Sequence, residues 1–263
     1  MLPLVAPPVA PRRGLRRSVE LFRAFRVEQS DPDLFYRTQA ADSLAQVRDH
    51  MEPAGRLIID VGGGAGWFSD TFRRAGATCV LVEPEAGRPV PDGADSHAVA
   101  VHPGRLAEGW TVAADGNRMP FPDGVADLTF SSNVLEHVPA PDRFLAEMVR
   151  VTRPGGLLYL SFTAWLSPWG GHETSPWHYL GGQRAAERYQ RRHGRLPGNL
   201  FGESLFPRHV GEVMDLVRSC PDVEVREAGP RYYPGWLAWV ARVPGLRELA
   251  TWNLLVIMRR RPS

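Results

Sequence analysis

The residues with the clearest chemical potential lie in the stretch IIDVGGGAGWFS, positions 58–69, where an apolar run ends in an acid and a cluster of glycines. A glycine turn between a strand and a helix is typical of nucleotide-like ligand sites, because glycine lets the backbone approach the ligand closely. The spacing here is Gly62-x-Gly64-x-Gly66. Dinucleotide-binding turns follow G-x-G-x-x-G instead, and phosphate-binding P-loops require G-K-[ST]. The spacing therefore disfavours a ligand that is held by its phosphates.

Three acids follow three successive predicted strands, and they narrow the ligand further. Asp60 ends the first strand, Glu83 ends the second, and Asp115 follows the third. A carboxylate repels a pyrophosphate but attracts an ammonium group. Glu83 follows Asp60 at about the 20-residue spacing at which an acid accepts hydrogen bonds from ribose hydroxyls. Asp115 can accept from an adenine amino group. The acids therefore indicate a ligand with adenosine, an amino group and no phosphate, which describes S-adenosylmethionine.

The motifs around these acids resemble the class I S-adenosylmethionine-dependent methyltransferases. The similar sequence covers residues 57–162 and contains DVGGGAGWFS, VEPE, AADGNRMPFPDG, DLTFSSNVLEH and RPGGLLYLSF. The resemblance implies that Asp60 and the turn hold the methionine part of the cofactor, that Glu83 holds the ribose and that Asp115 holds the adenine. It also places Asn133 beside the methionine part. The glycines implied in binding are Gly62, Gly63, Gly64, Gly66 and Gly116.

The segments outside this core carry a second resemblance. FRVEQSDPDLFYRTQAAD and WLSPWGGHETSPWHYLGG are similar to a methyltransferase family of mycobacteria and related actinobacteria. That resemblance implies no particular acceptor. Three alternatives for the glycine turn stay open: a tight turn without a ligand, a nicotinamide oxidoreductase, and a protein that binds S-adenosylmethionine without turnover.

The hydrophobic pattern predicts the elements that must position these residues. Apolar strands alternate with amphipathic helices, which predicts a Rossmann-like α/β fold of the class I methyltransferase type. We expect seven mostly parallel strands with an antiparallel last strand and helices on both faces. The expected strands are 56–61, 77–83, 110–115, 127–132, 156–162, 222–229 and 253–261. The expected helices are 66–76, 140–152 and 207–220, with a short helix near 104–108 and a helical segment over 235–252 that is interrupted at Pro244-Gly245.

The same pattern predicts one domain. A Pro-rich disordered tail is expected over 1–14 and a single methyltransferase domain over 15–263. Within the domain we expect N-terminal helices at 15–54, a cofactor-binding core at 55–163, an acceptor-side lid at 164–206, and a C-terminal helix, strands and helical cap at 207–263.

Polar residues after the fourth strand are candidates for work on the acceptor. Asn133, Glu136 and His137 have the spacing i, i+3, i+4, which places side chains on one face of a helical turn. In the quinone O-methyltransferases, which have a similar segment, the corresponding residues are Glu, Glu and His and bind a metal. In this sequence the first of these positions is Asn133, so one charged ligand is missing. This weakens the prediction of Mg²⁺ at Glu136 and His137. The alternative for His137 is a hydrogen bond to the backbone.

The lid adds further catalytic candidates, His172, Glu173 and His178, in the sequence GGHETSPWHYLGG. A His-Glu pair beside flexible glycines can act as a base near neutral pH. With His137, these residues form the set that we expect to act in catalysis. The alternatives are hydrogen bonds that order the lid, or a divalent ion shared with Glu136.

Aromatic residues of the lid indicate the acceptor. Aromatic faces stack on sugar rings and also fill apolar lids, so the expected acceptor is a hydroxyl on a sugar, polysaccharide or glycolipid-type molecule. A quinone or other phenol is the alternative. The lid residues concerned are Trp165, Trp169, Trp177 and Tyr179.

The C-terminal cap carries aromatic and basic residues whose ordinary interpretation is packing within the cap. Peripheral contact with a membrane surface is the alternative interpretation. The residues are Trp236, Trp239, Trp252, Arg242 and Arg259–Arg261.

Composition limits the other partners. The net charge is +2, so no strong electrostatic field favours a polyanionic partner. All 31 basic residues other than histidine are arginines, and the absence of lysine excludes Schiff-base chemistry. The sequence SSNV after the fourth strand differs from the Asn/Asp-Pro-Pro-aromatic sequence with which amino-methylating DNA enzymes stack a flipped base. We therefore expect no nucleic acid. Cys79 and Cys220 are expected to be buried free thiols, and with no apolar run of about 18 residues the expected location is the cytoplasm.

Overall fold

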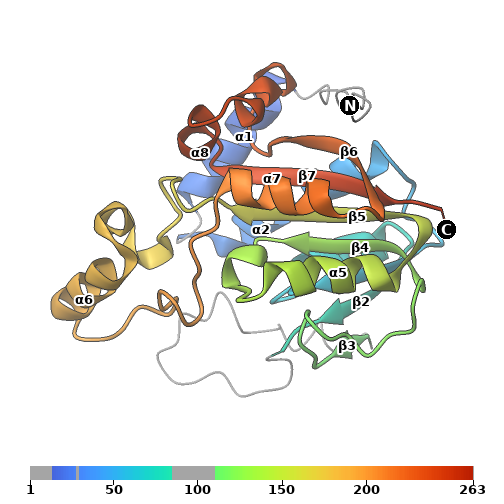
Figure 1. Ribbon diagram of the computed structural model, residues 1–263, viewed down its shortest axis with the longest axis horizontal. Helices are drawn as coiled ribbons and strands as arrows, with labels where there is room; N and C mark the ends of the chain where they lie inside the picture. Colours follow the sequence, from blue (N-terminus) through green and yellow to red (C-terminus); the bar gives the residue numbers. More distant parts are fainter. Residues whose placement is uncertain (1–13, 28–29, 85–109, 263) are drawn as a thin grey trace.

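A seven-stranded sheet forms the centre of the protein, in a computed structural model that describes residues 14–27, 30–84 and 110–262 (Figure 1). The strand order is β3-β2-β1-β4-β5-β7-β6. β7 runs antiparallel to β5 and β6, and the remaining neighbours are parallel. The sheet confirms the predicted Rossmann-like topology with an antiparallel last strand. The strands are β1 Leu57–Val61, β2 Thr78–Val82, β3 Thr111–Val112, β4 Ala126–Ser132, β5 Thr152–Thr163, β6 Val223–Pro230 and β7 Asn253–Arg260.

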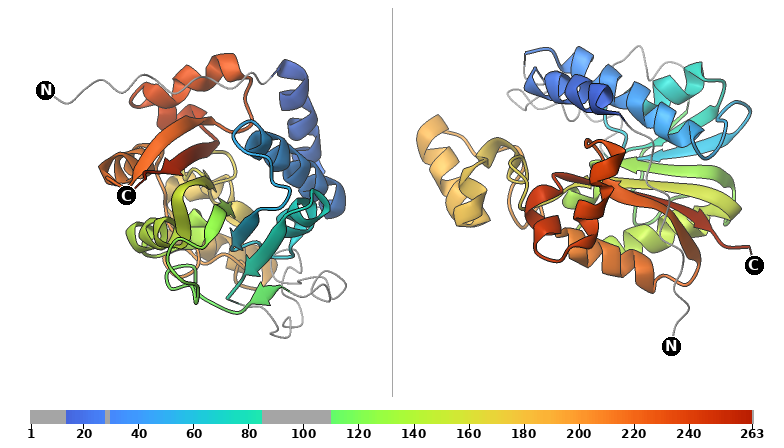
Figure 2. Two further views of the ribbon diagram at one scale, coloured as in Figure 1. Left: turned by 90° about the vertical axis from the view of Figure 1, so that its right-hand side faces the viewer. Right: turned by 90° about the horizontal axis from the view of Figure 1, so that it is seen from above.

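Helices cover both faces of the sheet, as Figure 2 shows in the view from above. α1, α2 and α3 lie on one face, and α5 and α7 lie on the other (Figure 1). The α-helices are α1 Leu15–Arg26, α2 Pro32–Arg48, α3 Trp67–Arg74, α5 Pro141–Val151, α6 Gly182–His193, α7 Val210–Ser219 and α8 Leu246–Ala250. Short 3₁₀ helices are η1 Leu135–His137, η2 His172–Thr174, η3 Trp177–Leu180 and η4 Gly235–Arg242.

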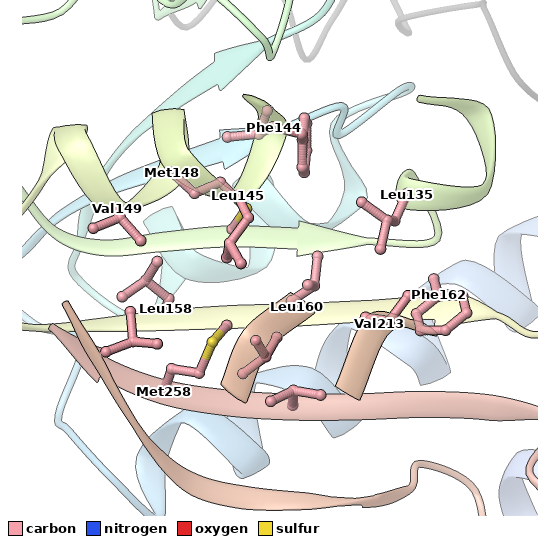
Figure 3. Packing of buried hydrophobic residues seen from close by; sticks show 14 of the residues in the cluster. Leu135, Phe144, Leu145, Met148, Val149, Leu158, Leu160, Phe162, Val213 and Met258 are labelled. Carbon is pink, nitrogen blue, oxygen red and sulfur yellow. The ribbon is translucent and has the colours of Figure 1, made fainter. Parts of the chain in front are cut away.

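Two hydrophobic clusters hold these layers together. On one face, Leu145 and Met148 of α5 and Val213 of α7 pack on Leu160 of β5 and Met258 of β7 (Figure 3). On the other face, α2 and α3 pack on the same strands through residues that include Val47, Phe72 and Phe130. Because successive side chains of a strand point to opposite faces, the apolar runs of β1, β4, β5 and β7 supply both clusters. This explains why their sequences are continuously hydrophobic.

The two N-terminal helices, α1 and α2, lie on the same face of the sheet as α3. Asp31 caps α2, since its Oδ1 accepts a hydrogen bond from the Leu34 N–H at 3.0 Å, and Pro32 occupies the first turn. Such a cap contributes about 1 kcal/mol to helix stability. α2 follows the cap directly, within the region 15–54 where N-terminal helices were predicted.

Several predicted boundaries differ from those observed. β3 is limited to Thr111–Val112, and β5 begins at Thr152, directly after α5. Arg153–Gly156 belongs to β5 and forms an irregularity in its pairing with β4. Ala126 pairs with Thr152, whereas Leu128 pairs with Leu157. Cys79 is buried as expected, but Cys220 is only partly buried because it follows α7 at its exposed end.

The lid extends from the end of β5, and its helix α6 lies outside the two helical layers (Figures 1 and 2). Among the described residues, none of the helices combines the length and the apolar composition needed to cross a bilayer. The predicted tail before Gly14 and the short helix expected near 104–108 lie outside the described residues.

Candidate functional site

The glycine turn connects β1 to α3 in a backbone conformation that favours glycine. Gly62, Gly64 and Gly66 have φ angles of 72°, 51° and 80°, in the left-handed region that side chains rarely adopt. A Cβ on Gly62 would meet Val134 at 2.6 Å, and one on Gly63 would collide with the Asp60 carboxylate. Glycine is therefore needed at both positions for the turn to pack against Val134 and Asp60 at the carboxyl end of β1, the end at which open α/β sheets bind ligands.

Asp60 lies beneath the glycine turn, against Gly63, and is 1% exposed. Its Oδ2 accepts a hydrogen bond from the Ser69 hydroxyl at 2.7 Å. Its Oδ1 is buried without a hydrogen-bond partner in the part of the chain that the structure describes. Burial raises the pKa of Asp60 to about 7, and the nearby charge of Glu83 adds to the rise. A buried carboxylate oxygen without a donor fits a ligand that brings an N–H group to this point.

Glu83 follows β2 and closes the other side of the turn. Its Oε2 accepts a hydrogen bond from the Gly64 N–H at 3.0 Å, and its own N–H donates to the Val112 carbonyl at 3.1 Å. These bonds join β2 to β3 on one side and to the glycine turn on the other. A ligand that reached Glu83 would thus also contact the turn.

Asp115 lies in an exposed turn after β3. Its Oδ1 accepts from the backbone and side-chain N–H groups of Asn117, both at 2.8 Å. Gly116 is buried, and a Cβ there would meet Phe144 at 2.5 Å and Val61 at 2.9 Å. Because β3, β2 and β1 are neighbours in the sheet, Asp115, Glu83 and Asp60 follow one another along a single edge, as the sequence predicted.

Asn133 directly follows β4 and has a φ of 58°. Its N–H donates to the Ser161 carbonyl at 2.9 Å, and its Oδ1 accepts from the Asn253 side-chain amide at 2.7 Å. Asn253 begins β7 and was not identified from the sequence. No local signal marked it, because only the insertion of β7 beside β5 brings it to this edge.

Glu136, His137 and His172 form a cluster next to Asn133, and one potential ligand atom from each lies within 4.8 Å of the others. Glu136 is buried, with Oε1 accepting from the Thr163 N–H at 3.0 Å and Oε2 without a partner among the described residues. Burial raises the pKa of Glu136. His137 Nδ1 is 2.6 Å from the Ser204 carbonyl. The structure thus brings two of the predicted catalytic histidines, His137 of η1 and His172 of η2, together with Glu136 of η1.

His172 enters the cluster from the lid. It has a φ of 47°, and its ring centroid is 5.0 Å from that of His137. Its Nε2 is buried without a partner in the described part of the chain. Burial, with the charges of His137 and His178, lowers the pKa of His172 to about 3. The imidazole of His172 is therefore neutral at physiological pH and has a lone pair on one ring nitrogen.

Glu173 and His178 face other parts of the lid. Both carboxylate oxygens of Glu173 accept from the Asn199 side-chain amide, at 3.0 and 3.1 Å. His178 is 1% exposed, and its ring nitrogens face the Ser167 carbonyl at 3.2 Å and the Ser175 hydroxyl at 3.3 Å. The structure does not bring either residue into the cluster, although His178 is close enough to influence the pKa of His172.

Arg231 is a fully buried cation behind this edge of the sheet. Its guanidinium donates to the hydroxyls of Ser132 at 2.8 Å, Ser161 at 3.0 Å and Ser43 at 2.7 Å. It therefore joins β4, β5 and α2. The sequence did not single out this arginine among the other basic residues.

An aromatic cavity of about 120 Å³ lies between α1, the lid and the cap. Trp169 is central to it, with ring centroids 4.7 Å from Phe25 and 5.0 Å from Trp252. Trp252 directly precedes Asn253, so the cavity adjoins the Asn133–Asn253 pair. The residues that line it are Ser18, Leu21, Phe22, Phe25, Trp169, Tyr232, Tyr233, Pro234 and Trp252.

The other lid aromatics lie outside this cavity. Trp165 packs against His178 and Phe201. Trp177 is 42% exposed, with the Arg188 guanidinium 3.8 Å from its ring centroid, and Tyr179 is 47% exposed. Of the predicted acceptor aromatics in the lid, only Trp169 lines the cavity.

The residues predicted to contact a membrane also lie in different parts of the structure. Trp236 and Trp239 of η4 are 70% and 49% exposed, whereas Trp252 lines the cavity. Arg259–Arg261 lie at the opposite end of β7 from Asn253, where Arg259 donates to the Gly155 carbonyl at 2.7 Å. The basic cluster therefore belongs to the far edge of the sheet rather than to the cap.

The strand order, the glycine turn and the acids along one edge define a class I S-adenosylmethionine-dependent methyltransferase. A model of the methyltransferase domain family matches residues 59–160. A protein of Mycobacterium sp. (strain JLS) named "Uncharacterized methyltransferase" is 46% identical over 256 residues, covering 95% of this chain and 97% of the relative. The chain belongs to this family of methyltransferases, and its cofactor is S-adenosylmethionine.

Solved structures support the fold. An S-adenosylmethionine-dependent methyltransferase from Mesorhizobium loti is 21% identical with a TM-score of 0.53, covering 83% of this chain and 98% of its own. Geranyl diphosphate C-methyltransferase from Streptomyces coelicolor, in complex with Mg²⁺, geranyl diphosphate and S-adenosyl-L-homocysteine, is 15% identical with a TM-score of 0.52, covering 89% of this chain and 83% of its own. At these identities the likeness concerns the fold.

Proposed function

We propose that this methyltransferase transfers the methyl group to a hydroxyl oxygen of a sugar-containing acceptor, of the glycolipid type, whose apolar part occupies the aromatic cavity. The cavity beside the Asn133–Asn253 pair carries this proposal, because it holds an apolar group next to the end of β4. Rings such as Phe25, Trp169 and Trp252 bind apolar and ring-shaped groups. A free polysaccharide has no apolar part for such a cavity, so the observation favours a glycolipid-type molecule among the sugar acceptors.

We assign cofactor binding to the edge formed by β1, β2 and β3. Asp60, with its unpartnered Oδ1, pairs with the amino group of the methionine part, Glu83 accepts from the ribose hydroxyls, and Asp115 accepts from the adenine. Asn133 borders the methionine part. The glycine turn, formed by Gly62, Gly63, Gly64 and Gly66, lets the ligand approach the backbone, and Gly116 allows close packing against Phe144 and Val61 on the adenine side. When bound, the cofactor supplies an electrophilic methyl group on a sulfonium.

The chain's own residues then orient the acceptor and help remove its proton. We assign activation of the hydroxyl to the cluster of Glu136, His137 and His172, since it presents inward-facing oxygen and nitrogen lone pairs. We assign Glu173 and His178 to the order of the lid, because their polar atoms are engaged there.

A phenol or quinone-derived acceptor is the second candidate. The same cavity supports it, since stacked aromatic side chains suit a flat ring as well as a lipid chain. The two candidates differ in where the polar group is expected, on a sugar or directly on the aromatic ring.

We also propose that the cap rests on a membrane surface that delivers the acceptor. The exposed Trp236, Trp239 and Leu249 support this contact, and they lie in the segment that follows the cavity residues Tyr233 and Pro234. Exposed aromatic residues favour the interface between water and lipid.

Methyl-labelled S-adenosylmethionine tests the acceptor. The purified protein is incubated separately with a cell-envelope lipid extract, a delipidated polysaccharide fraction and a mixture of phenols and quinones. We expect the label in a lipid-soluble product that releases an O-methyl sugar on acid hydrolysis. A labelled phenol establishes the second candidate. If no fraction is labelled although S-adenosylhomocysteine binds, the protein holds the cofactor without turnover and the proposal is wrong.

A further inference from the structure

We propose that Glu136, His137 and His172 bind a divalent transition-metal ion of the Zn²⁺ type through one carboxylate oxygen and two imidazole nitrogens. The three potential ligand atoms lie within 4.8 Å of one another. Ligands around a tetrahedral zinc ion lie about 3.3 Å apart, given bond lengths of about 2.0–2.1 Å. Small side-chain rotations would close this difference.

Neighbouring hydrogen bonds orient two of the three ligands. The Ser204 carbonyl, 2.6 Å from His137 Nδ1, accepts the proton on that nitrogen and leaves the lone pair on Nε2. The Thr163 N–H donates to Glu136 Oε1 at 3.0 Å and leaves Oε2 for a second partner. Metal-binding histidines and carboxylates are held by outer hydrogen bonds of this kind.

Two of the buried polar atoms without a partner among the described residues belong to this cluster. They are Glu136 Oε2 and His172 Nε2. A buried polar atom without a hydrogen bond costs about 1–3 kcal/mol, so such atoms are rare in a native fold unless a water or ion completes them. One cation between them would satisfy both atoms and also offset the burial of the Glu136 carboxylate.

The backbone of the lid holds His172 in place at a cost. Its φ of 47° lies in the left-handed region, where a residue other than glycine costs about 1–3 kcal/mol. The preceding residue, Gly171, is closely packed, since a Cβ on it would lie 2.5 Å from His178. This strained conformation directs the ring toward His137 rather than into solvent.

The ligand types identify the class of ion. Two imidazoles with one carboxylate suit Zn²⁺, Fe²⁺ or Co²⁺, whereas Mg²⁺ prefers oxygen ligands only. Asn133 is not part of the set, because its Oδ1 accepts from Asn253. His172 therefore supplies the third ligand that the sequence around β4 lacks, and the Mg²⁺ considered from the sequence is replaced by a transition metal.

Three protein ligands leave a fourth position for an external oxygen. The cluster adjoins Asn133 at the carboxyl edge of β4, where the proposed acceptor site lies. An ion there lowers the pKa of a bound hydroxyl, whose proton passes to water. The oxygen then bonds to the methyl carbon while the carbon–sulfur bond breaks. This last step depends on the proposed O-methylation, whereas binding of the ion does not.

Calorimetry on the full-length protein, stripped with a chelator and dialysed, tests the site with ZnCl₂ and MgCl₂ alone. We expect one Zn²⁺ per chain and no measurable Mg²⁺ binding. Loss of a residue that only supports a metal ligand weakens metal binding by up to about 100-fold. Loss of a ligand itself should weaken Zn²⁺ binding by at least this factor. His172→Gln and Glu136→Gln should therefore each lose this affinity, while His193→Gln, on the exposed side of α6, keeps it.

Binding of S-adenosylhomocysteine shows that each variant is folded and keeps the cofactor site separate from the metal test. Should both variants fail to fold, Co²⁺ added to the unaltered protein should produce the visible absorption of a low-coordinate nitrogen and oxygen site. Failure of the unaltered protein to bind Zn²⁺, or equal affinity in His172→Gln, overturns the metal site. Failure to methylate any hydroxyl with the metal bound instead overturns the proposed function.

Discussion

The side-chain amide of Asn253 donates a 2.7 Å hydrogen bond to Asn133 Oδ1 and so joins the start of β7 to the end of β4 across β5. Asn133 has a φ of 58°, and its N–H is bonded to the Ser161 carbonyl. The bond therefore holds a strained residue at the edge where cofactor and acceptor are proposed to meet. Neighbouring Trp252 links the same strand end to the aromatic cavity.

Asn253→Ala should lower the free energy of unfolding by about 1 kcal/mol, the usual net value of one hydrogen bond. Affinity for S-adenosylhomocysteine should fall as well, because Asn133 loses the partner that orients it. Denaturant titration and calorimetry measure the two effects. Asn199→Ala, which removes a bond to Glu173 inside the lid, serves as the control with unchanged cofactor affinity. Equal cofactor affinity in both variants contradicts the role of Asn253.

Asp60→Asn and Glu83→Ala should each weaken S-adenosylhomocysteine binding at least tenfold, about 1.4 kcal/mol. The first removes a charge that pairs with the amino group, and the second removes the proposed ribose acceptor and the bond to Gly64. Calorimetry gives the affinities. Asp70→Asn, which disrupts only the ion pair with Arg74 on α3, is the control. Unchanged affinity in both test variants would refute the assignment of the β1–β2 edge.

Cofactor binding should depend on pH through Asp60. Burial raises the pKa of this carboxyl to about 7, so protonation below that pH removes the charge that attracts an ammonium group. Affinity for S-adenosylhomocysteine should therefore rise as pH increases through about 7, by up to tenfold for each unit below the pKa. Asp60→Asn should flatten this profile. A profile that keeps its slope in this variant assigns the dependence to another group.

The same pKa predicts the stability of the ligand-free protein. A carboxyl whose folded-state pKa is raised from 3.8 to about 7 binds its proton more tightly when folded. Its stabilising contribution is complete below the unfolded pKa and is lost as pH rises through about 7. Denaturant titrations of the native protein and of Asp60→Asn, at pH values between 3.8 and about 7, measure this contribution. If the stability of the native protein rises over this pH range more than that of the variant, the predicted direction is wrong.

Trp169→Ala should raise the KM for the acceptor about tenfold, the loss expected when one well-packed aromatic contact of about 1.4 kcal/mol is removed. Cofactor affinity should not change, because Trp169 lies in the cavity between α1 and the cap rather than at the glycine turn. Steady-state kinetics on the labelled product provide the measurement. Trp177→Ala is the matched control, since Trp177 is exposed beside Arg188. Equal KM values for the two variants place the acceptor elsewhere.

The double variant Trp236→Ser and Trp239→Ser should lose most binding to vesicles that contain anionic lipids. Both side chains are exposed on η4, and their transfer to the lipid interface supplies the binding energy. Co-sedimentation measures the bound fraction. Trp110→Ser is a suitable control, because Trp110 is 58% exposed next to β3 at the other end of the strand order. A native protein that does not sediment with vesicles contradicts membrane contact by the cap.

Local patterns were sufficient for most of the fold. Apolar runs and turn residues act over a few positions, so β1, β2, β4, β6, β7 and the helices α3, α5 and α7 lie within a few residues of their predicted bounds. β5 begins earlier than expected, because pairing with β4 continues through Arg153–Gly156 with an irregular register. β3 is shorter than predicted, since only two of its residues pair with β2. These differences arise from strand pairing, which sequence periodicity does not contain.

S-adenosylmethionine could be predicted as the methyl donor from local sequence alone, because the glycine spacing and the acids Asp60, Glu83 and Asp115 can each be recognised within one strand or turn. The arrangement of the residues proposed to act on the acceptor became visible in the tertiary structure alone. It joined His172 of the lid to Glu136 and His137, separated them from Glu173 and His178, and placed Asn253 beside Asn133. It also combined α1, the lid and the cap into one aromatic cavity. The cause is distance along the chain: Glu136 and His172, like Asn133 and Asn253, come from segments that sequence periodicity describes separately and that only folding brings together.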